Sequence, residues 1–103
     1  MAGTSEAKTA LGVLRIADAQ PSGVASFRRL YDEIPNVVKL SASDMEESDT
    51  RPGEPMWHQI VRNIQSHHAA EGNYIAEGYL EHVPRVGYRI TYAGRRLLRA
   101  KGF

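Results

Sequence analysis

Residues 79–91, with the sequence YLEHVPRVGYRIT, contain the pattern that decides the fold. Two short runs of alternating apolar and polar residues flank a Pro-Arg-Val-Gly connection, which is typical of a β-hairpin. Arg89 is expected to point outward and Arg85 to lie at the tip of the turn. A period of two places three side chains on the core face, namely Leu80, Tyr88 and Ile90. Such a hairpin either grips a partner or closes a core.

A basic helix is predicted directly after the hairpin, in the stretch TYAGRRLLRAKGF. Thr91 is a suitable N-cap, and Leu97 and Leu98 are expected to pack inward. Glycine inside a helix costs about 1 kcal/mol relative to alanine, so we expect another element to approach closely at Gly94. The side chains expected to remain in solvent are Arg95, Arg96, Arg99 and Lys101.

The segment before the hairpin predicts an amphipathic helix over about 55–70, with Pro55 at its first position. Gly72 is expected to form a left-handed C-cap, and Asn73 to cap one further turn. At about 100° per residue, the apolar side of the helix carries Trp57, Ile60, Val61, Ile64 and His68. The opposite, polar side carries Gln59, Arg62, Asn63 and Ser66.

Two more helices are predicted in the first half of the chain. The first is expected to start at a cap on Thr4 or Ser5 and to run for about 14 residues. The second is expected to be capped by Ser22 and ended by Pro35. Apolar residues at helical spacing are Ala7, Leu11, Leu14 and Ala17 in the first helix, and Val24, Phe27, Leu30, Tyr31 and Ile34 in the second.

The connection between the second and third helices carries weaker signals. The run NVVKL at 36–40 fits either a short strand or a buried connection. Ser43 and Glu46 have the spacing of a capping box, which predicts one or two helical turns. Residues 48–55 combine charge, proline and glycine, and therefore predict an exposed loop.

The predicted order is three helices, a hairpin and a final helix, in one α+β, mostly α-helical domain spanning 1–103. This is the plan of a winged helix-turn-helix domain, in which the helix before the hairpin enters the major groove of DNA. The hairpin 79–91 is then the wing, which touches the adjacent backbone or minor groove. A three-helix bundle with an additional hairpin predicts a similar pattern, so the order leaves both folds open.

Composition and charge exclude several classes of protein and favour one kind of partner. The 103 residues include no cysteine, which excludes disulfides and thiolate metal sites. No apolar run reaches the roughly 20 residues of a membrane span, and no cleavable signal pattern is present, so we expect a cytoplasmic protein outside the membrane. The net charge is +1, but residues 1–50 carry −3 and residues 51–103 carry +4. This asymmetry favours a polyanion as the partner of the second half.

Several residues of the second half match a known family. They are Trp57, Val61, Arg62 and Asn63 in the third helix, Gly78, Tyr79 and Leu80 at the opening of the hairpin, and Gly87, Tyr88, Ile90, Thr91, Gly94 and Arg95 around its end. Together they cover roughly half of the chain and resemble the N-terminal winged-helix domain of Mrr-type restriction endonucleases. The resemblance implies DNA binding, usually by a domain tethered to a nuclease. Since the sequence has no Asp…Glu-x-Lys nuclease signature, we expect the DNA-reading part of a restriction or regulatory system.

On this prediction, double-stranded DNA is bound by the polar side of the third helix and by the wing. Arginine can contact guanine with two hydrogen bonds, and asparagine or glutamine can contact adenine in the same way. Serine and the wing arginines can contact phosphates, and arginine can also enter the minor groove. The same residue types are ordinary on a solvated helix face and at a charged hairpin tip. The predicted DNA-contacting residues are Gln59, Arg62, Asn63, Ser66, Arg85 and Arg89.

The sequence predicts no catalytic, metal or cofactor site. Adjacent helical residues such as His67 and His68 point about 100° apart and cannot chelate one ion together. Neither a nucleophile elbow nor a phosphate-binding glycine loop is present. We therefore expect no enzyme activity, no cofactor and no small-molecule substrate.

A protein-interaction module without DNA binding is the alternative function. A net charge of +1 is low for a domain that binds DNA alone. The terminal helices also offer a surface for a homodimer, in which the basic final helix meets the acidic segment DMEES of a second copy. A large apolar patch would favour this alternative, whereas a positive band over the third helix and wing would favour DNA.

Overall fold

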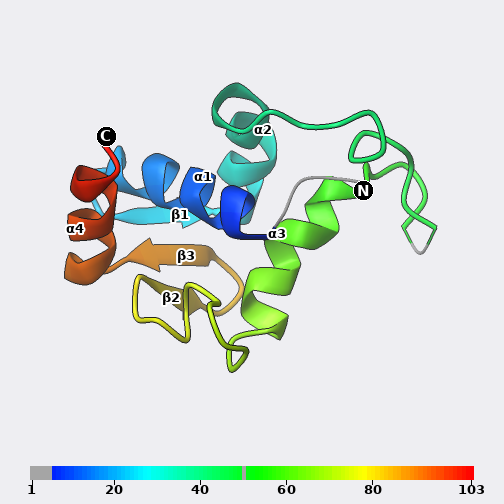
Figure 1. The fold of residues 1–103 in the computed structure, drawn as a ribbon. Helices are drawn as coiled ribbons and strands as arrows, with labels where there is room; N and C mark the ends of the chain where they lie inside the picture. The colour runs from blue at the N-terminus through cyan, green and yellow to red at the C-terminus, as the bar shows by residue number, and fades with distance from the viewer. Residues whose placement is uncertain (1–5, 50) are drawn as a thin grey trace.

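The first helix lies at the centre of the fold. The computed structural model describes residues 6–49 and 51–103, and α1 (Glu6–Asp18) packs against the sheet and against the other three helices found there (Figure 1). The predicted caps Thr4 and Ser5 lie outside the described residues. The described chain is a small α+β fold with four helices and one three-stranded antiparallel sheet. After α1 follow β1 (Val24–Ser26), α2 (Phe27–Val37), α3 (Trp57–Ser66), β2 (Leu80–Val83), β3 (Gly87–Ile90) and α4 (Tyr92–Ala100).

The predicted hairpin is confirmed and forms two of the three strands. The sheet has the order β1–β3–β2, so β3 is its central strand. Leu80 pairs with Ile90, and both are buried together with Tyr88. Arg89 is exposed on the opposite face of the sheet, as the period of two predicts.

The core forms between α1, the inner face of the sheet and the other helices. On the predicted apolar stripe of α1, Leu14 and Ala17 are buried and Leu11 is half-buried. Ala7, in the first turn of the helix, is exposed. The largest buried side chains are Tyr88, Leu14, Leu30, Ile34, Ile64, Leu80 and Leu98.

The prediction for the start of the second helix is wrong. Val24 belongs to β1, and α2 begins at Phe27 with Ser26 as its N-cap, whose Oγ accepts from the N–H of Arg29 at 3.1 Å. The predicted cap, Ser22, accepts from the N–H of Val24 at 3.3 Å in the turn before the strand. A strand of three residues is too short to show alternation, and its hydrogen bonds go to β3, far away in sequence.

Pro35 does not end α2, contrary to the prediction. The helix continues through Pro35 to Val37, and the N–H of Val38 donates to the carbonyl of Ile34 at 2.9 Å. In the last turn of a helix, the missing N–H of proline removes a single backbone hydrogen bond, which the fold tolerates. The run at 36–40 is therefore the end of a helix and a connection, and not a strand.

The predicted capping box at Ser43 and Glu46 does not form a helix. Ser41 and Asp44 pair instead: Ser41 N donates to Asp44 Oδ2 at 2.8 Å, and Asp44 N donates to Ser41 Oγ at 3.2 Å. These reciprocal bonds close a turn without continuing into helical hydrogen bonding. The same capping chemistry thus stabilises a turn two residues earlier than predicted.

The loop predicted at 48–55 folds back on itself. Glu47 and Pro55 form an isolated β-bridge, so Pro55 precedes α3 and is not its first residue. Ser48 is only 5% exposed, and its N–H donates to the carbonyl of Glu54 at 2.7 Å. Only part of the segment, including 51–53, is exposed as predicted.

α3 is shorter than the predicted helix over 55–70. It spans Trp57–Ser66, and turns follow. His68, predicted on the apolar side, is exposed because the helix ends before it. Gly72 has the predicted left-handed backbone, with φ +83°, but within a turn. Asn73 caps the next turn as predicted, since its Oδ1 accepts from two backbone N–H groups.

α4 begins as the sequence predicts. Thr91 caps it, with Oγ1 accepting from the N–H of Gly94 at 3.0 Å. A Cβ at Gly94 would overlap with the carbonyl oxygen of Tyr79, so the predicted close approach is confirmed. Leu98 is buried and Leu97 half-buried.

Two of the three arginines of α4, Arg96 and Arg99, are exposed as predicted, and the third is not. Arg95 and Arg99 both donate to Asp18 of α1, the second at 3.4 Å. Arg95 is half-buried, which corrects its predicted position in solvent, whereas Arg96 and Lys101 are exposed. Within 6–49 and 51–103, no helix has the length and apolar character needed to cross a membrane.

Candidate nucleic-acid interface

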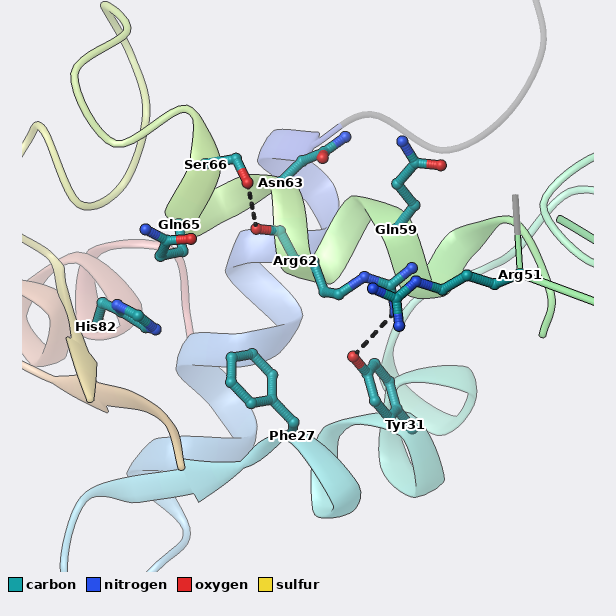
Figure 2. A pocket seen from close by; sticks show the side chains of 9 residues that line it. All are labelled: Phe27, Tyr31, Arg51, Gln59, Arg62, Asn63, Gln65, Ser66 and His82. Atoms are coloured by element: carbon teal, nitrogen blue, oxygen red, sulfur yellow. Dashed lines mark hydrogen bonds between the residues drawn. The ribbon is translucent and has the colours of Figure 1, made fainter. Parts of the chain in front are cut away.

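The polar face of α3 lines a groove between α2, α3 and β2. The burial of Trp57, Val61 and Ile64 against the core turns this polar face outward. The groove has a volume of about 510 Å³, and Figure 2 shows its lining: Phe27, Tyr31, Arg51, Gln59, Arg62, Asn63, Gln65, Ser66 and His82. Four of the six predicted DNA-contacting residues therefore lie together, namely Gln59, Arg62, Asn63 and Ser66.

Arg62 is the best-anchored cation of the groove. Its Nη1 lies 3.0 Å from Oε1 of Glu54 and 3.4 Å from the hydroxyl oxygen of Tyr31. Burial disfavours the charged guanidinium, but the hydrogen bonds with Tyr31 and Glu54 outweigh it and raise the pKa of Arg62. In Figure 2, Arg62 extends toward Tyr31, whereas Gln59 and Asn63 extend to another side of α3. One helix thus contributes an arginine and two amides to the lining of the groove, from two of its sides.

Aromatic contacts support the floor beside Arg62. The ring of His58 stacks on that of Tyr31, with centroids 4.1 Å apart and planes 14° apart. Trp57 packs edge-on against His58 at 4.3 Å. Burial lowers the pKa of His58 from its ordinary value; the carboxylate of Glu54 opposes this effect, and Arg62 adds to it. The neutral imidazole is therefore favoured under the guanidinium.

The hairpin is fixed to α3 by one buried hydroxyl. Tyr88 donates to the carbonyl of Val61 at 2.6 Å and accepts from the N–H of Gln65 at 3.1 Å. Burial raises the pKa of Tyr88, so its hydroxyl stays protonated. His82, the cross-strand neighbour of Tyr88, lines the groove. The orientation of the hairpin relative to α3 is thereby set.

The two predicted wing residues, Arg85 and Arg89, do not line the groove. Arg85 is exposed at the hairpin tip with a left-handed backbone, φ 66°. The tip adjoins the groove, because the carbonyl of Val86 accepts from the N–H of Phe27 at 2.8 Å. Arg89 points to the outer face of the sheet, where it pairs with Glu81 at 3.2 Å.

Several groove residues were missed from the sequence. Tyr31 was assigned to the apolar stripe of its helix, although its hydroxyl reaches Arg62. Arg51 and Glu54 belong to the segment predicted as an exposed loop, and the sequence analysis gives His82 no role. Tyr31 reaches α3 from α2, His82 from β2, and Arg51 and Glu54 from the connection between α2 and α3, so no local pattern signals them.

The groove offers several hydrogen-bond donors. Guanidinium, amide and hydroxyl groups can bind phosphates and base edges. Among the residues that the structure describes, no three of His, Cys, Asp and Glu are grouped so as to hold a metal ion. No protein-family model, curated protein or solved structure matches this chain, so the functional argument rests on the groove itself.

Proposed function

We propose that this chain is a winged-helix domain that binds double-stranded DNA. In this proposal α3 enters the major groove and the hairpin is the wing. The element order supports it, since three helices precede the hairpin and α3 comes directly before it. With the resemblance to Mrr-type N-terminal domains, we extend the proposal to a DNA-reading role in a restriction or regulatory system of the cytoplasm.

One observation carries the proposal: the polar face of α3 is gathered around a groove. Arg62, Asn63 and Gln59 are the residue types that contact guanine and adenine with paired hydrogen bonds. They lie on one helix, which is the element that the major groove of B-DNA admits.

The charge of the groove also favours a polyanion. Arg51 and Arg62 line it, and the acidic group beside it is Glu54, whose carboxylate pairs with Arg62 at 3.0 Å. Arg62 remains cationic because its raised pKa lies far above neutrality. Arg85, exposed at the adjoining hairpin tip, would add a phosphate contact beside α3.

Titration of duplex DNA against matched arginine variants tests this function. We expect Arg62→Ala to weaken binding by about 5- to 150-fold, because a lost paired contact to guanine costs about 1–3 kcal/mol. Arg85→Ala should weaken binding to all sequences and reduce the slope of log affinity against log salt by about 0.9. Arg96→Ala removes the same charge from α4, at the other side of the molecule (Figure 1), and should bind like the parent.

The outcome separates DNA binding from a general charge effect. If Arg62→Ala and Arg85→Ala both bind duplex DNA like the parent, α3 and the hairpin are not the interface. If Arg96→Ala weakens binding as much as Arg62→Ala, net charge alone explains the affinity. Both results would overturn the proposal in its present form.

The alternative function is that of a protein-interaction module, and the surface that supports it lies on α4. A shallow hollow of about 330 Å³ on α4 is lined by Tyr79, Ala93, Arg96, Leu97 and Ala100. Tyr92 is 76% exposed on the same helix. We propose a second copy of this chain as the partner of this surface. Sedimentation would then show a dimer that dissociates in Ala93→Glu, and a monomeric parent would exclude it.

A further inference from the structure

Glu54 lies where an incoming phosphate would bind Arg62. Its Oε1 is 3.0 Å from Nη1 of Arg62 and 3.8 Å from Nδ1 of His58. The side chains of Arg62 and Glu54 are 26% and 30% exposed, so the pair borders solvent. The anchor described above is therefore also an occupied anion position.

The loop that carries Glu54 holds its backbone beside α3. The N–H of Ser48 donates to the carbonyl of Glu54 at 2.7 Å, and the N–H of Met56 donates to the carbonyl of Glu46 at 2.8 Å. The bridge between Glu47 and Pro55 closes the same small loop. Because these bonds involve the backbone, the carboxylate can leave Arg62 by side-chain rotation while the loop stays folded.

We propose that Glu54 is an internal competitor for the phosphate that binds Arg62. This inference rests on the proposed DNA-binding function. In the free protein the carboxylate occupies Arg62; on binding, a phosphate replaces it and Glu54 turns to solvent or toward His58. A phosphate that binds Nη1 of Arg62 must therefore first displace a charge-assisted hydrogen bond.

The competition would raise selectivity at the expense of affinity. Non-specific DNA binding depends almost wholly on phosphate contacts. A carboxylate beside Arg62 weakens those contacts, whereas a correct sequence adds base contacts from Asn63 and Gln59 that compensate for the displacement. Discrimination between partners often relies on such a repulsive group.

The competing explanation is that Glu54 only positions Arg62 for the base. Both explanations rest on the distance between Glu54 and Arg62, but they predict opposite changes in DNA affinity when the carboxylate is neutralised. A competitor, once neutralised, leaves Arg62 more available and strengthens DNA binding. A positioning group, once neutralised, leaves Arg62 mobile and weakens it.

Glu54→Gln, titrated with a random-sequence duplex at several salt concentrations, distinguishes the two. We expect it to bind about 5- to 10-fold more tightly than the parent at low salt, with a salt slope steeper by up to about 0.9, because no freed carboxylate takes up a cation. Glu33→Gln, which removes the same charge from an exposed pair with Arg29 outside the groove lining, should change affinity by less than about 2-fold. Glu54→Asp keeps the charge but withdraws it, and should lie between parent and Glu54→Gln.

A DNA-free titration separates this inference from the proposed function. Inorganic phosphate is added while the Nε–Hε signal of Arg62 is followed by NMR, and we expect Glu54→Gln to respond at several-fold lower phosphate than the parent. If this holds while neither protein binds duplex DNA, the competition stands and the DNA function is wrong. Weaker DNA binding by Glu54→Gln, an equal effect of Glu33→Gln, or an unchanged phosphate response would overturn the competition.

Discussion

α3 and α4 are both amphipathic helices that pack against α1, on opposite sides of it (Figure 1). α4 carries three arginines and α3 only one. Two of the α4 arginines are bound to Asp18, and the hollow beside them is mainly apolar. The single arginine of α3 lies in a groove with amides, a hydroxyl and a second arginine. The two helices therefore differ in the arrangement of their hydrogen-bond donors as well as in the number of their charges, and the proposed DNA-binding surface depends on that arrangement.

The two helices are also held in different ways. Gly94 of α4 lies so close to the carbonyl of Tyr79 that no side chain fits. α3 is held to the hairpin by the hydroxyl of Tyr88, which contacts Val61 and Gln65. A substitution at each of these contacts tests whether the two helices contribute separately to stability and to DNA binding.

The largest effect is expected from Gly94→Ala. Alanine favours a helix by about 1 kcal/mol over glycine, but its Cβ would overlap with Tyr79, and overpacking of this kind costs about 1–3 kcal/mol or more. Because the overlap is with a backbone atom, we expect a cost at the upper end of this range and a net loss of about 2 kcal/mol in the free energy of unfolding, measured by urea denaturation. DNA affinity of the folded variant should not change, because α4 is not the proposed interface. A more stable variant would show that the close approach is absent.

Tyr88→Phe is expected to cost about 1–2 kcal/mol of unfolding free energy, since it removes a hydroxyl that bonds one buried and one partly buried backbone group. Tyr92→Phe is the matched control, because Tyr92 is 76% exposed. It should change stability by less than about 0.5 kcal/mol. Equal stabilities of the two variants would mean that the hydroxyl of Tyr88 does not hold the hairpin to α3.

The C-terminal half was largely predictable from the sequence, because its determinants are local. The alternation around Tyr88 and Ile90 fixed the faces of the hairpin, and Thr91 and Gly94 marked the start and the close contact of α4. The polar side of α3 followed from helical periodicity, and its four predicted residues lie in one groove. Whether they bind DNA remains a proposal.

The features that the sequence did not predict depend on contacts between residues far apart in sequence. β1 is a strand only because β3 lies beside it. Tyr31 and Glu54 approach Arg62 through the folding of a connection that shows no periodicity. The pairing of Arg95 with Asp18 joins residues 77 positions apart. In each case a hydrogen-bonding partner, which no local pattern specifies, decides the structure.

Asp18→Asn tests whether the arginines of α4 can contribute to DNA binding. It frees Arg95 and Arg99 of α4, and we expect a loss of about 0.5–1 kcal/mol of stability, as for partly exposed ion pairs. Although two arginines become available, DNA affinity should rise by less than about 2-fold, within the range of a remote charge change. A rise as large as that expected for Glu54→Gln would assign α4 to the DNA-binding surface.

The smallest expected effect is a change of stability with pH. It arises from a histidine of α3 and has no counterpart in α4, which contains no histidine. Burial lowers the pKa of His58 below 6.5, against the attraction of Glu54 and with a contribution from Arg62. As the pH falls through 6.5, the unfolded chain takes up this proton before the folded protein does. The free energy of unfolding should therefore decrease below this pH and be unaffected by His58 above it.

His58→Gln should remove this part of the pH dependence, so the parent should lose more stability than the variant between pH values of about 7.5 and 5.5 in urea denaturation. Glu54→Gln should change the pKa of His58 in the intact ring. Without the carboxylate near its Nδ1, the pKa of His58 should fall further, which NMR titration of the imidazole would measure. A rise or no change in that pKa would mean that Glu54 does not lie between His58 and Arg62 in solution. The position of Glu54, on which the proposed competition for Arg62 depends, would then be lost.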